Sequence, residues 1–161
     1  MNSVELAIKM ETDAIKFYRE AAERTRNAVG KKMFLSVAED EKRHIEILSR
    51  HLEGLDLTVR QASPLKNVRT IFEEMKESMM QRVEATPDEL EAFRVAMDME
   101  KEGKSFYERA VAAAPTEKER KLFEILVREE EEHFFIFQNT YSFLSDTGNW
   151  FMWQEHSIVE G

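Results

Sequence analysis

The chain has 161 residues and a mass of 18.9 kDa, which is the usual size of one domain. Its 32 acidic residues outnumber its 23 basic residues, and the formal net charge of −9 argues against nucleic-acid binding because phosphates would be repelled. Cysteine is absent, which excludes disulfides, thiolate metal sites and cysteine nucleophiles, so any metal must be bound by Glu, Asp and His.

The predicted elements are helices, because only 5 glycines and 3 prolines interrupt a chain whose apolar residues recur at three- and four-residue steps. A first helical hairpin is predicted over about 3–53, with its turn near Arg26. A second hairpin is predicted over about 87–144, with its turn at Pro115. Three pairs have the spacing of a capping box and mark helix starts: Asn2 with Glu5, Thr86 with Glu89, and Thr116 with Glu119.

The two hairpins are joined by a crossover of about 54–86, which is long enough to let the second and third long helices run parallel. An amphipathic helix is predicted within it from the spacing of Val68, Ile71, Phe72, Met75, Met79 and Val83. The tail over 145–161 carries Trp150 and Trp153 and is predicted to pack on the bundle or on a second subunit. The whole chain, 1–161, is therefore predicted to be one all-α domain, a four-helix bundle with an extra helix in its crossover.

The hairpins repeat one sequence pattern at an offset of 89 residues, since METDAIKFYREA matches MEKEGKSFYERA and EKRH matches EEEH. Within each copy, one helix carries a single Glu and the next carries Glu-x-x-His, whose i, i+3 spacing places both side chains on one helix face. Glu100 and Glu130 each lie 15 residues from Pro115, so antiparallel helices would place them at the same height. The six candidate metal ligands are Glu11, Glu41, His44, Glu100, Glu130 and His133.

Four buried carboxylates without a partner would be very costly, whereas two divalent cations would balance their four negative charges. Oxygen-rich donors with one imidazole per metal suit iron or manganese better than structural zinc. One Glu from each of two helices and Glu-x-x-His from each of two others is the pattern of di-iron carboxylate bundles. We therefore predict two iron ions as the cofactor, with manganese or a mixed pair as alternatives.

In these motifs the chain, over about 3–145, resembles the ferritin-like di-iron superfamily, and within it the rubrerythrin-like branch that has no rubredoxin domain. The resemblance implies a ferritin-like four-helix bundle. It also implies that Glu41 and Glu130 bridge the two metals, with Glu11 and Glu100 as terminal ligands. Two departures stand out: Gly103 lies where rubrerythrins with the full peroxidase site carry a further Glu, and no cysteine-bound iron is present to supply electrons.

Further side chains are predicted near the site. In the superfamily an acid at the positions of Asp40 and Glu129 tends to hold the imidazole of the opposite motif. Plain surface charge is nevertheless the default expectation for Glu129, whereas Asp40 is expected either at the imidazole or at the surface. Tyr18 and Tyr107 lie seven residues after a ligand Glu, so each either contacts the site or is an ordinary core tyrosine. Surface positions are expected for the remaining candidates, namely Glu131, Glu132, His51 and His156.

The leading functional prediction is a rubrerythrin-like di-iron oxidoreductase that reduces peroxide or reacts with dioxygen, with a separate rubredoxin-like electron donor. The alternatives are a ferroxidase, an iron-storage or iron-handling protein, and a metal-binding module without turnover. No apolar run reaches 18 residues and the N-terminus has no basic segment, so we expect no membrane span and no secretory signal, and a cytoplasmic location. A homodimer is the expected assembly.

Overall fold

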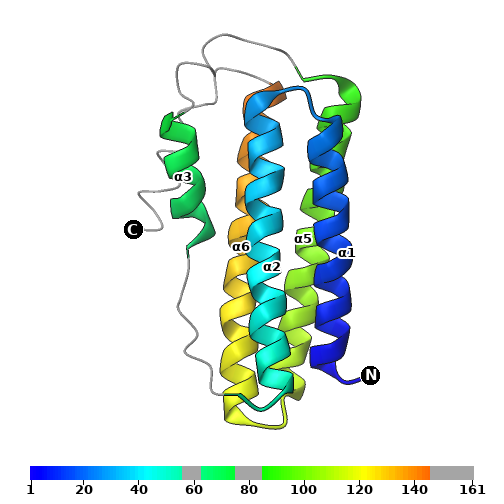
Figure 1. Cartoon of the computed structure of the whole chain (residues 1–161), viewed down its shortest axis with the longest axis vertical. Coiled ribbons are helices and arrows are strands. Elements are labelled where there is room, and N and C mark those ends of the chain that lie inside the picture. Colours follow the sequence, from blue (N-terminus) through cyan, green and yellow to red (C-terminus); the bar gives the residue numbers. More distant parts are fainter. Residues whose placement is uncertain (56–62, 75–84, 146–161) are drawn as a thin grey trace.

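In the part of the chain that the structure describes, four long helices form a bundle and a shorter helix lies beside them (Figure 1). The structure is a computed structural model that describes residues 1–55, 63–74 and 85–145. Its helices are α1 (Ser3–Arg24), α2 (Ala28–Leu52), α3 (Pro64–Glu74), α5 (Pro87–Ala113) and α6 (Glu117–Ser145). No strand occurs in these described ranges, so the prediction of an all-α ferritin-like bundle is confirmed.

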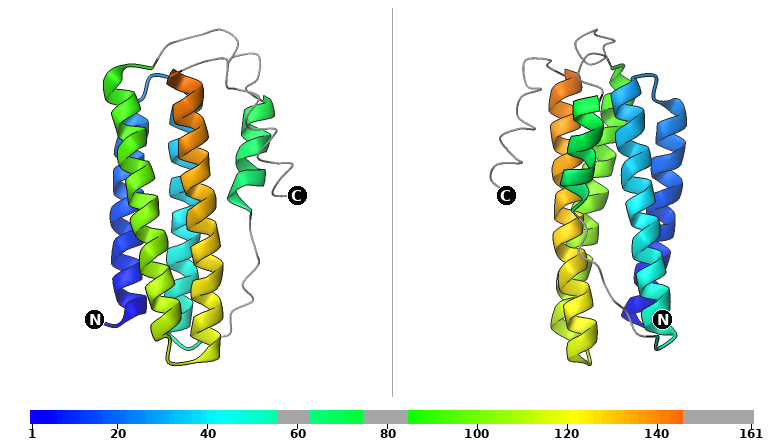
Figure 2. Two further views of the ribbon diagram at one scale, coloured as in Figure 1. Left: turned by 180° about the vertical axis from the view of Figure 1, so that it is seen from behind. Right: turned by 60° about the vertical axis from the view of Figure 1, so that its left-hand side comes forward.

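The connection between the hairpins gives the bundle its topology. The helices α1 and α2 are antiparallel neighbours, as are α5 and α6, whereas α2 and α5 run in the same direction (Figure 1). The helix α3 lies on the outside of the bundle, against α2 and α6 (Figure 2). It corresponds to the N-terminal part of the predicted crossover helix, whose later residues Met75, Met79 and Val83 lie outside the described residues. Trp150 and Trp153 of the predicted tail also lie outside them.

The helix starts follow their capping signals. Capping boxes begin α1, at Asn2 with Glu5, and α5, at Thr86 with Glu89. Thr116 accepts a hydrogen bond from the Glu119 backbone amide at 3.1 Å, which is one half of the third predicted box. A cap that the motif search did not find begins α2, where the Asn27 side chain accepts from the Gly30 amide at 3.0 Å.

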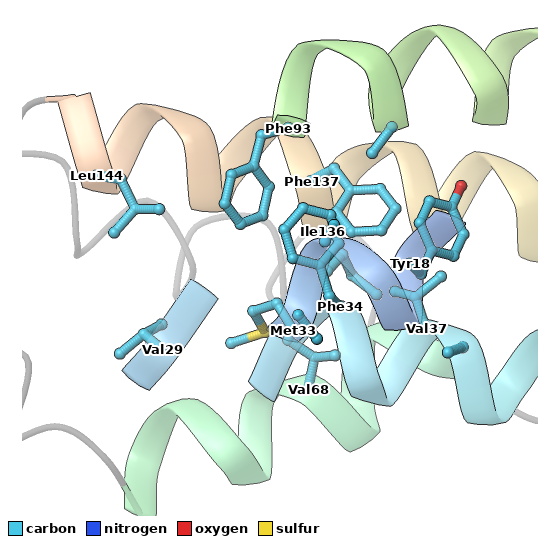
Figure 3. Packing of buried hydrophobic residues seen from close by; sticks show 14 of the residues in the cluster. Tyr18, Val29, Met33, Phe34, Val37, Val68, Phe93, Ile136, Phe137 and Leu144 are labelled. Carbon is cyan, nitrogen blue, oxygen red and sulfur yellow. The ribbon is translucent and has the colours of Figure 1, made fainter. Parts of the chain in front are cut away.

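Two apolar clusters fill the bundle, one on each side of a polar layer. The first is rich in aromatic rings, including the stacked pair Phe34 and Phe93 with ring centroids 4.3 Å apart (Figure 3). The second includes Leu48, Phe123 and Leu126. Along α1, Ala14 belongs to the first cluster and Ala7 to the second, so Glu11 lies between the two clusters.

The surface of the described helices is strongly charged, and each helix buries one apolar face. Within the described ranges, no helix carries an apolar stretch of the length that a bilayer crossing needs. The polar layer inside the bundle therefore stands out, because it is the place where charged side chains are buried together in the core.

Candidate metal centre

All six predicted ligands point into the polar layer and none is more than 2% exposed. One Glu comes from α1 and one from α5, while α2 and α6 each supply a Glu and a His one turn apart. This arrangement follows from the repeat, since equal distances from the two helical turns place equivalent residues at one height. The structure thus brings together Glu11, Glu41, His44, Glu100, Glu130 and His133.

The first set of donor atoms surrounds the Nδ1 atom of His44. This atom lies 3.6 Å from Glu11 Oε2, 3.3 Å from Glu41 Oε1 and 3.4 Å from Glu130 Oε1. One atom from each of the four side chains can be chosen so that all four lie within 4.8 Å of one another. That spacing suits donors that share one cation.

The second set surrounds His133 in the same way. Its Nδ1 atom lies 2.9 Å from Glu41 Oε1, 3.4 Å from Glu100 Oε2 and 4.0 Å from Glu130 Oε2. This second group of four donors also falls within 4.8 Å. Because Glu41 and Glu130 belong to both sets, the geometry fits two adjacent cations with two shared carboxylates.

Unpartnered atoms show that this layer fits a metal pair. Buried polar atoms in proteins are almost always hydrogen-bonded, because an unpaired one costs several kcal/mol. Here each of the six residues has one buried atom without a hydrogen-bond partner: Glu11 Oε2, Glu41 Oε1, His44 Nδ1, Glu100 Oε2, Glu130 Oε1 and His133 Nδ1. Four carboxylates and two imidazoles are the donors that iron and manganese accept, and two divalent ions would balance the charge.

Without a cation the carboxylates compete for protons. Burial, and after it the charges of Glu11 and Glu100, raise the pKa of Glu41 to about 8. Burial also opposes ionisation of Glu11, but its interactions with the neighbouring Glu41 and His44 outweigh it and lower the pKa of Glu11 to about 2. Opposed shifts of this kind mean that the cluster titrates as one unit, and that cation binding would displace protons from it.

Both imidazoles are oriented from behind by an acid on the opposite helix. His44 Nε2 lies 2.9 Å from Glu129 Oε1, and His133 Nε2 lies 2.5 Å from Asp40 Oδ2. Arg43 forms ion pairs with both acids. Each ring is thereby turned so that Nδ1 faces the cluster, which is the usual way a protein fixes the orientation of a metal-binding histidine.

Of the alternatives for these acids, solvent-facing charge is wrong for Glu129, which is fully buried. The grouping of Asp40, His44 and Glu129 also has the spacing of a cation site, but its atoms are joined by hydrogen bonds and by Arg43, so a cation is not needed there.

Two tyrosines close the layer along the bundle axis. The Tyr18 hydroxyl donates to Glu100 Oε1 at 2.6 Å, and the Tyr107 hydroxyl donates to Glu11 Oε1 at 2.8 Å. Both side chains are fully buried, and burial with the nearby carboxylate charge raises the pKa of each hydroxyl well above its usual value. The hydroxyls therefore keep their protons and hold one oxygen each of Glu100 and Glu11, leaving the other oxygen free to face a cation.

Two other sequence expectations are wrong. Glu132 is buried and accepts a hydrogen bond from the Ser63 hydroxyl at 2.9 Å, beside α3. His51 Nε2 lies 3.0 Å from Glu119 Oε1 in a half-buried pair between α2 and α6. The pair can form because the end of α2 and the start of α6 lie at the same end of the bundle (Figure 1). Glu131 is exposed to 44% and fits its surface expectation, while His156 lies outside the described residues.

Gly103 has a clear structural role that its small size explains. A Cβ atom added there would lie 3.1 Å from Glu130 Oε2, closer than an ordinary van der Waals contact. The glycine therefore lets α5 pass close to a shared carboxylate without a side chain between them. Because residue 103 is a glycine, it supplies no carboxylate to the centre.

Comparison with known proteins gives one match. The family model described as rubrerythrin matches residues 2–141, which include all six donors and both tyrosines. No match to the chain was found among curated proteins or among solved structures.

Proposed function

The chain belongs to the rubrerythrin family, and from this premise we propose that it is a di-iron oxidoreductase that reduces hydrogen peroxide to water. The observation that carries the proposal is the buried cluster of six donors, in which two four-residue sets share Glu41 and Glu130 and each residue offers one unpartnered atom. A purely structural layer would pair those atoms with one another or with neighbours. We also propose that the protein acts in the cytoplasm, as is typical of the family.

Two ferrous ions at this centre would supply the two electrons that peroxide reduction requires. Hydrogen peroxide accepts two electrons and two protons, its O–O bond breaks, and two water molecules form. The residues of the chain hold the metal pair and keep its surroundings fixed. Tyr18 and Tyr107 anchor the terminal carboxylates by hydrogen bonds, and Glu129 and Asp40 fix the two imidazoles.

The aromatic cluster keeps the site dry on one side. Tyr18 packs on Phe137 with ring centroids 5.1 Å apart and stacks on Phe34 at 6.2 Å, so apolar rings lie directly behind its hydroxyl (Figure 3). On the other side, Tyr107 packs on Phe123 at 5.8 Å. Exclusion of water strengthens the interactions between the carboxylates and a bound cation, because the surroundings are less polarisable than water.

The test is the reaction of anaerobically iron-loaded protein with each oxidant in a stopped-flow spectrometer. We expect two ferrous ions per chain to be oxidised, and peroxide to react at least tenfold faster than dioxygen. The variant His44→Asn should lose half or more of the metal and of the reaction. The matched control His51→Asn alters a histidine outside the cluster and should retain both. Failure of ferrous protein to react faster with peroxide than with dioxygen would contradict the proposal.

A second candidate function is iron handling without peroxide turnover, and the observation that favours it is Gly103 in place of the extra family Glu. Without that carboxylate, the centre has only the six donors described. Uptake of many more than two iron ions per chain would favour ferroxidase or storage activity. Retention of two ions that neither oxidant attacks would favour a metal-binding module. Peroxide turnover with an added rubredoxin-like reductant would favour the enzyme.

A further inference from the structure

A small pocket opens between α1 and α5 directly beside the carboxylates of the metal centre. Its volume is about 160 Å³, which is room for several water molecules at about 30 Å³ each. Its lining includes Glu11, Asp13 and Ala14 of α1 and Glu100, Glu102 and Gly103 of α5.

The pocket is built from both copies of the repeat. Asp13 and Glu102 are equivalent positions 89 residues apart, and so are Ala14 and Gly103. The two acids are exposed, and the two small residues directly after them are buried. The pocket therefore has a pair of exposed carboxylates at its mouth, the cluster at its floor, and Ala14 and Gly103 in its wall beside Met10 and Met99.

Ala14 and Gly103 add little side-chain volume to the wall above the floor. A Cβ atom at Gly103 would already lie 3.1 Å from Glu130 Oε2, so even an alanine here would approach that carboxylate closely. At the floor, Glu11 Oε2 and Glu100 Oε2 are buried and have no hydrogen-bond partner. Along the bundle axis the Tyr18 and Tyr107 hydroxyls cover the carboxylates, and both imidazoles are fully buried.

The charged side chains that line the pocket are all acidic. None of the described residues that line it is basic, and within the described part of the chain Asp13 and Glu102 have no ion-pair partner. Two nearby lysines of α5 are directed toward α6 instead: Lys101 Nζ lies 5.2 Å from the ring centre of Phe134, and Lys104 Nζ lies 3.6 Å from Glu131 Oε1. An acidic mouth above an acidic floor attracts cations and repels anions.

We propose that this pocket is the loading port through which divalent cations enter the metal centre, with Asp13 and Glu102 attracting each cation at the mouth. The inference rests on the proposed function, in that a metal pair must first reach the cluster. Gly103 and Ala14 keep the path to the shared carboxylates short. The chemical class of the ligand is a hydrated divalent cation, which exchanges its waters for carboxylate oxygens as it passes inward.

The test measures how fast metal-free protein takes up Co²⁺, whose visible absorption reports binding by the cluster. At low ionic strength we expect Asp13→Asn/Glu102→Gln to load about tenfold more slowly than the wild type, and Asp13→Lys/Glu102→Lys to load more slowly still. Saturating cobalt should still give two ions per chain. The matched control Glu23→Gln/Glu108→Gln removes two exposed charges from the same helices away from the pocket, and it should load within twofold of the wild type.

Salt gives a second readout, because the screening length falls from about 30 Å at 0.01 M to about 3 Å at 1 M. The difference between the wild type and the mouth variants should therefore shrink strongly in 1 M salt. Equal loading rates for Asp13→Asn/Glu102→Gln and the wild type, or equal slowing in the control, would overturn the port. Absence of any cobalt uptake by the wild type would instead overturn the metal centre itself, so the two failures are distinguishable.

Discussion

Glu41→Gln should make the metal-free protein more stable and the metal-loaded protein less stable than the wild type. Burial and the neighbouring carboxylates raise the pKa of Glu41 from 4.5 to about 8. Between these values the folded chain binds a proton that the unfolded chain releases, so the metal-free wild type loses stability as the pH rises from 4.5 to 8. Glutamine resembles the protonated acid in shape and does not titrate, so the variant lacks this loss.

The magnitude follows from the interval between pH 4.5 and a working pH of 7. At 1.36 kcal/mol per pH unit, the wild type loses about 3 kcal/mol of unfolding free energy over that interval. A chain of this length shifts its Tm by roughly 2–4 °C per kcal/mol, so the variant should melt about 6–12 °C higher than the wild type in the presence of a chelator. At pH 4.5 the difference should be small, since Glu41 is then protonated in the folded chain.

Metal should reverse the order of the two proteins. A cation present at a thousand times its Kd stabilises the folded state by about 4 kcal/mol, and the wild type can gain this at each set of donors. The variant lacks a carboxylate that belongs to both sets, so it should gain much less. The assay is thermal unfolding with chelator and with Mn²⁺, at pH 4.5 and pH 7. A variant that melts below the wild type in chelator at pH 7 would refute the electrostatic reasoning.

Three other predictions concern residues around the centre. Gly103→Ala should raise the Tm of metal-free protein slightly, since alanine favours helices by up to about 1 kcal/mol, yet weaken Mn²⁺ binding in a competition titration because its Cβ crowds Glu130. Glu129→Gln should weaken Mn²⁺ binding about 10- to 100-fold by leaving His44 poorly oriented, and unchanged affinity would contradict this. Glu89→Gln should cost about 1–3 kcal/mol in chemical denaturation at pH 7. Burial opposes ionisation of Glu89, but backbone amides outweigh it and lower its pKa, so that stabilisation is present above pH 4.5 and disappears as the pH falls through the lowered pKa.

The grouping of the six donor residues could be predicted from the sequence, because their spacing determines both the helix face and the height at which each one lies. Each Glu-x-x-His fixes a face, and the two turns fix the height, so no knowledge of side-chain packing is needed. Where a helix carries four glutamates in a row, however, spacing alone cannot say which face is buried. In the run Glu129 to Glu132, successive side chains point about 100° apart, and the register of α6 decides that Glu129 is buried while Glu131 is partly exposed.

Pairings between helices that are distant in sequence were also beyond prediction. His51 meets Glu119, and Ser63 meets Glu132, because of how α2, α3 and α6 pack together. The role of Gly103 likewise depends on the distance between α5 and a side chain of α6, which no motif encodes. The predictions of a dimer, of a separate electron donor and of a packed aromatic tail remain predictions.

The most direct test of the metal centre is a crystal of the iron-loaded protein measured above the iron absorption edge. We predict two anomalous peaks per chain in the polar layer, both in contact with Glu41 and Glu130, with His44 Nδ1 on one peak and His133 Nδ1 on the other. A single peak, or iron bound outside the layer while the six side chains stay paired with one another, would contradict the two-cation account.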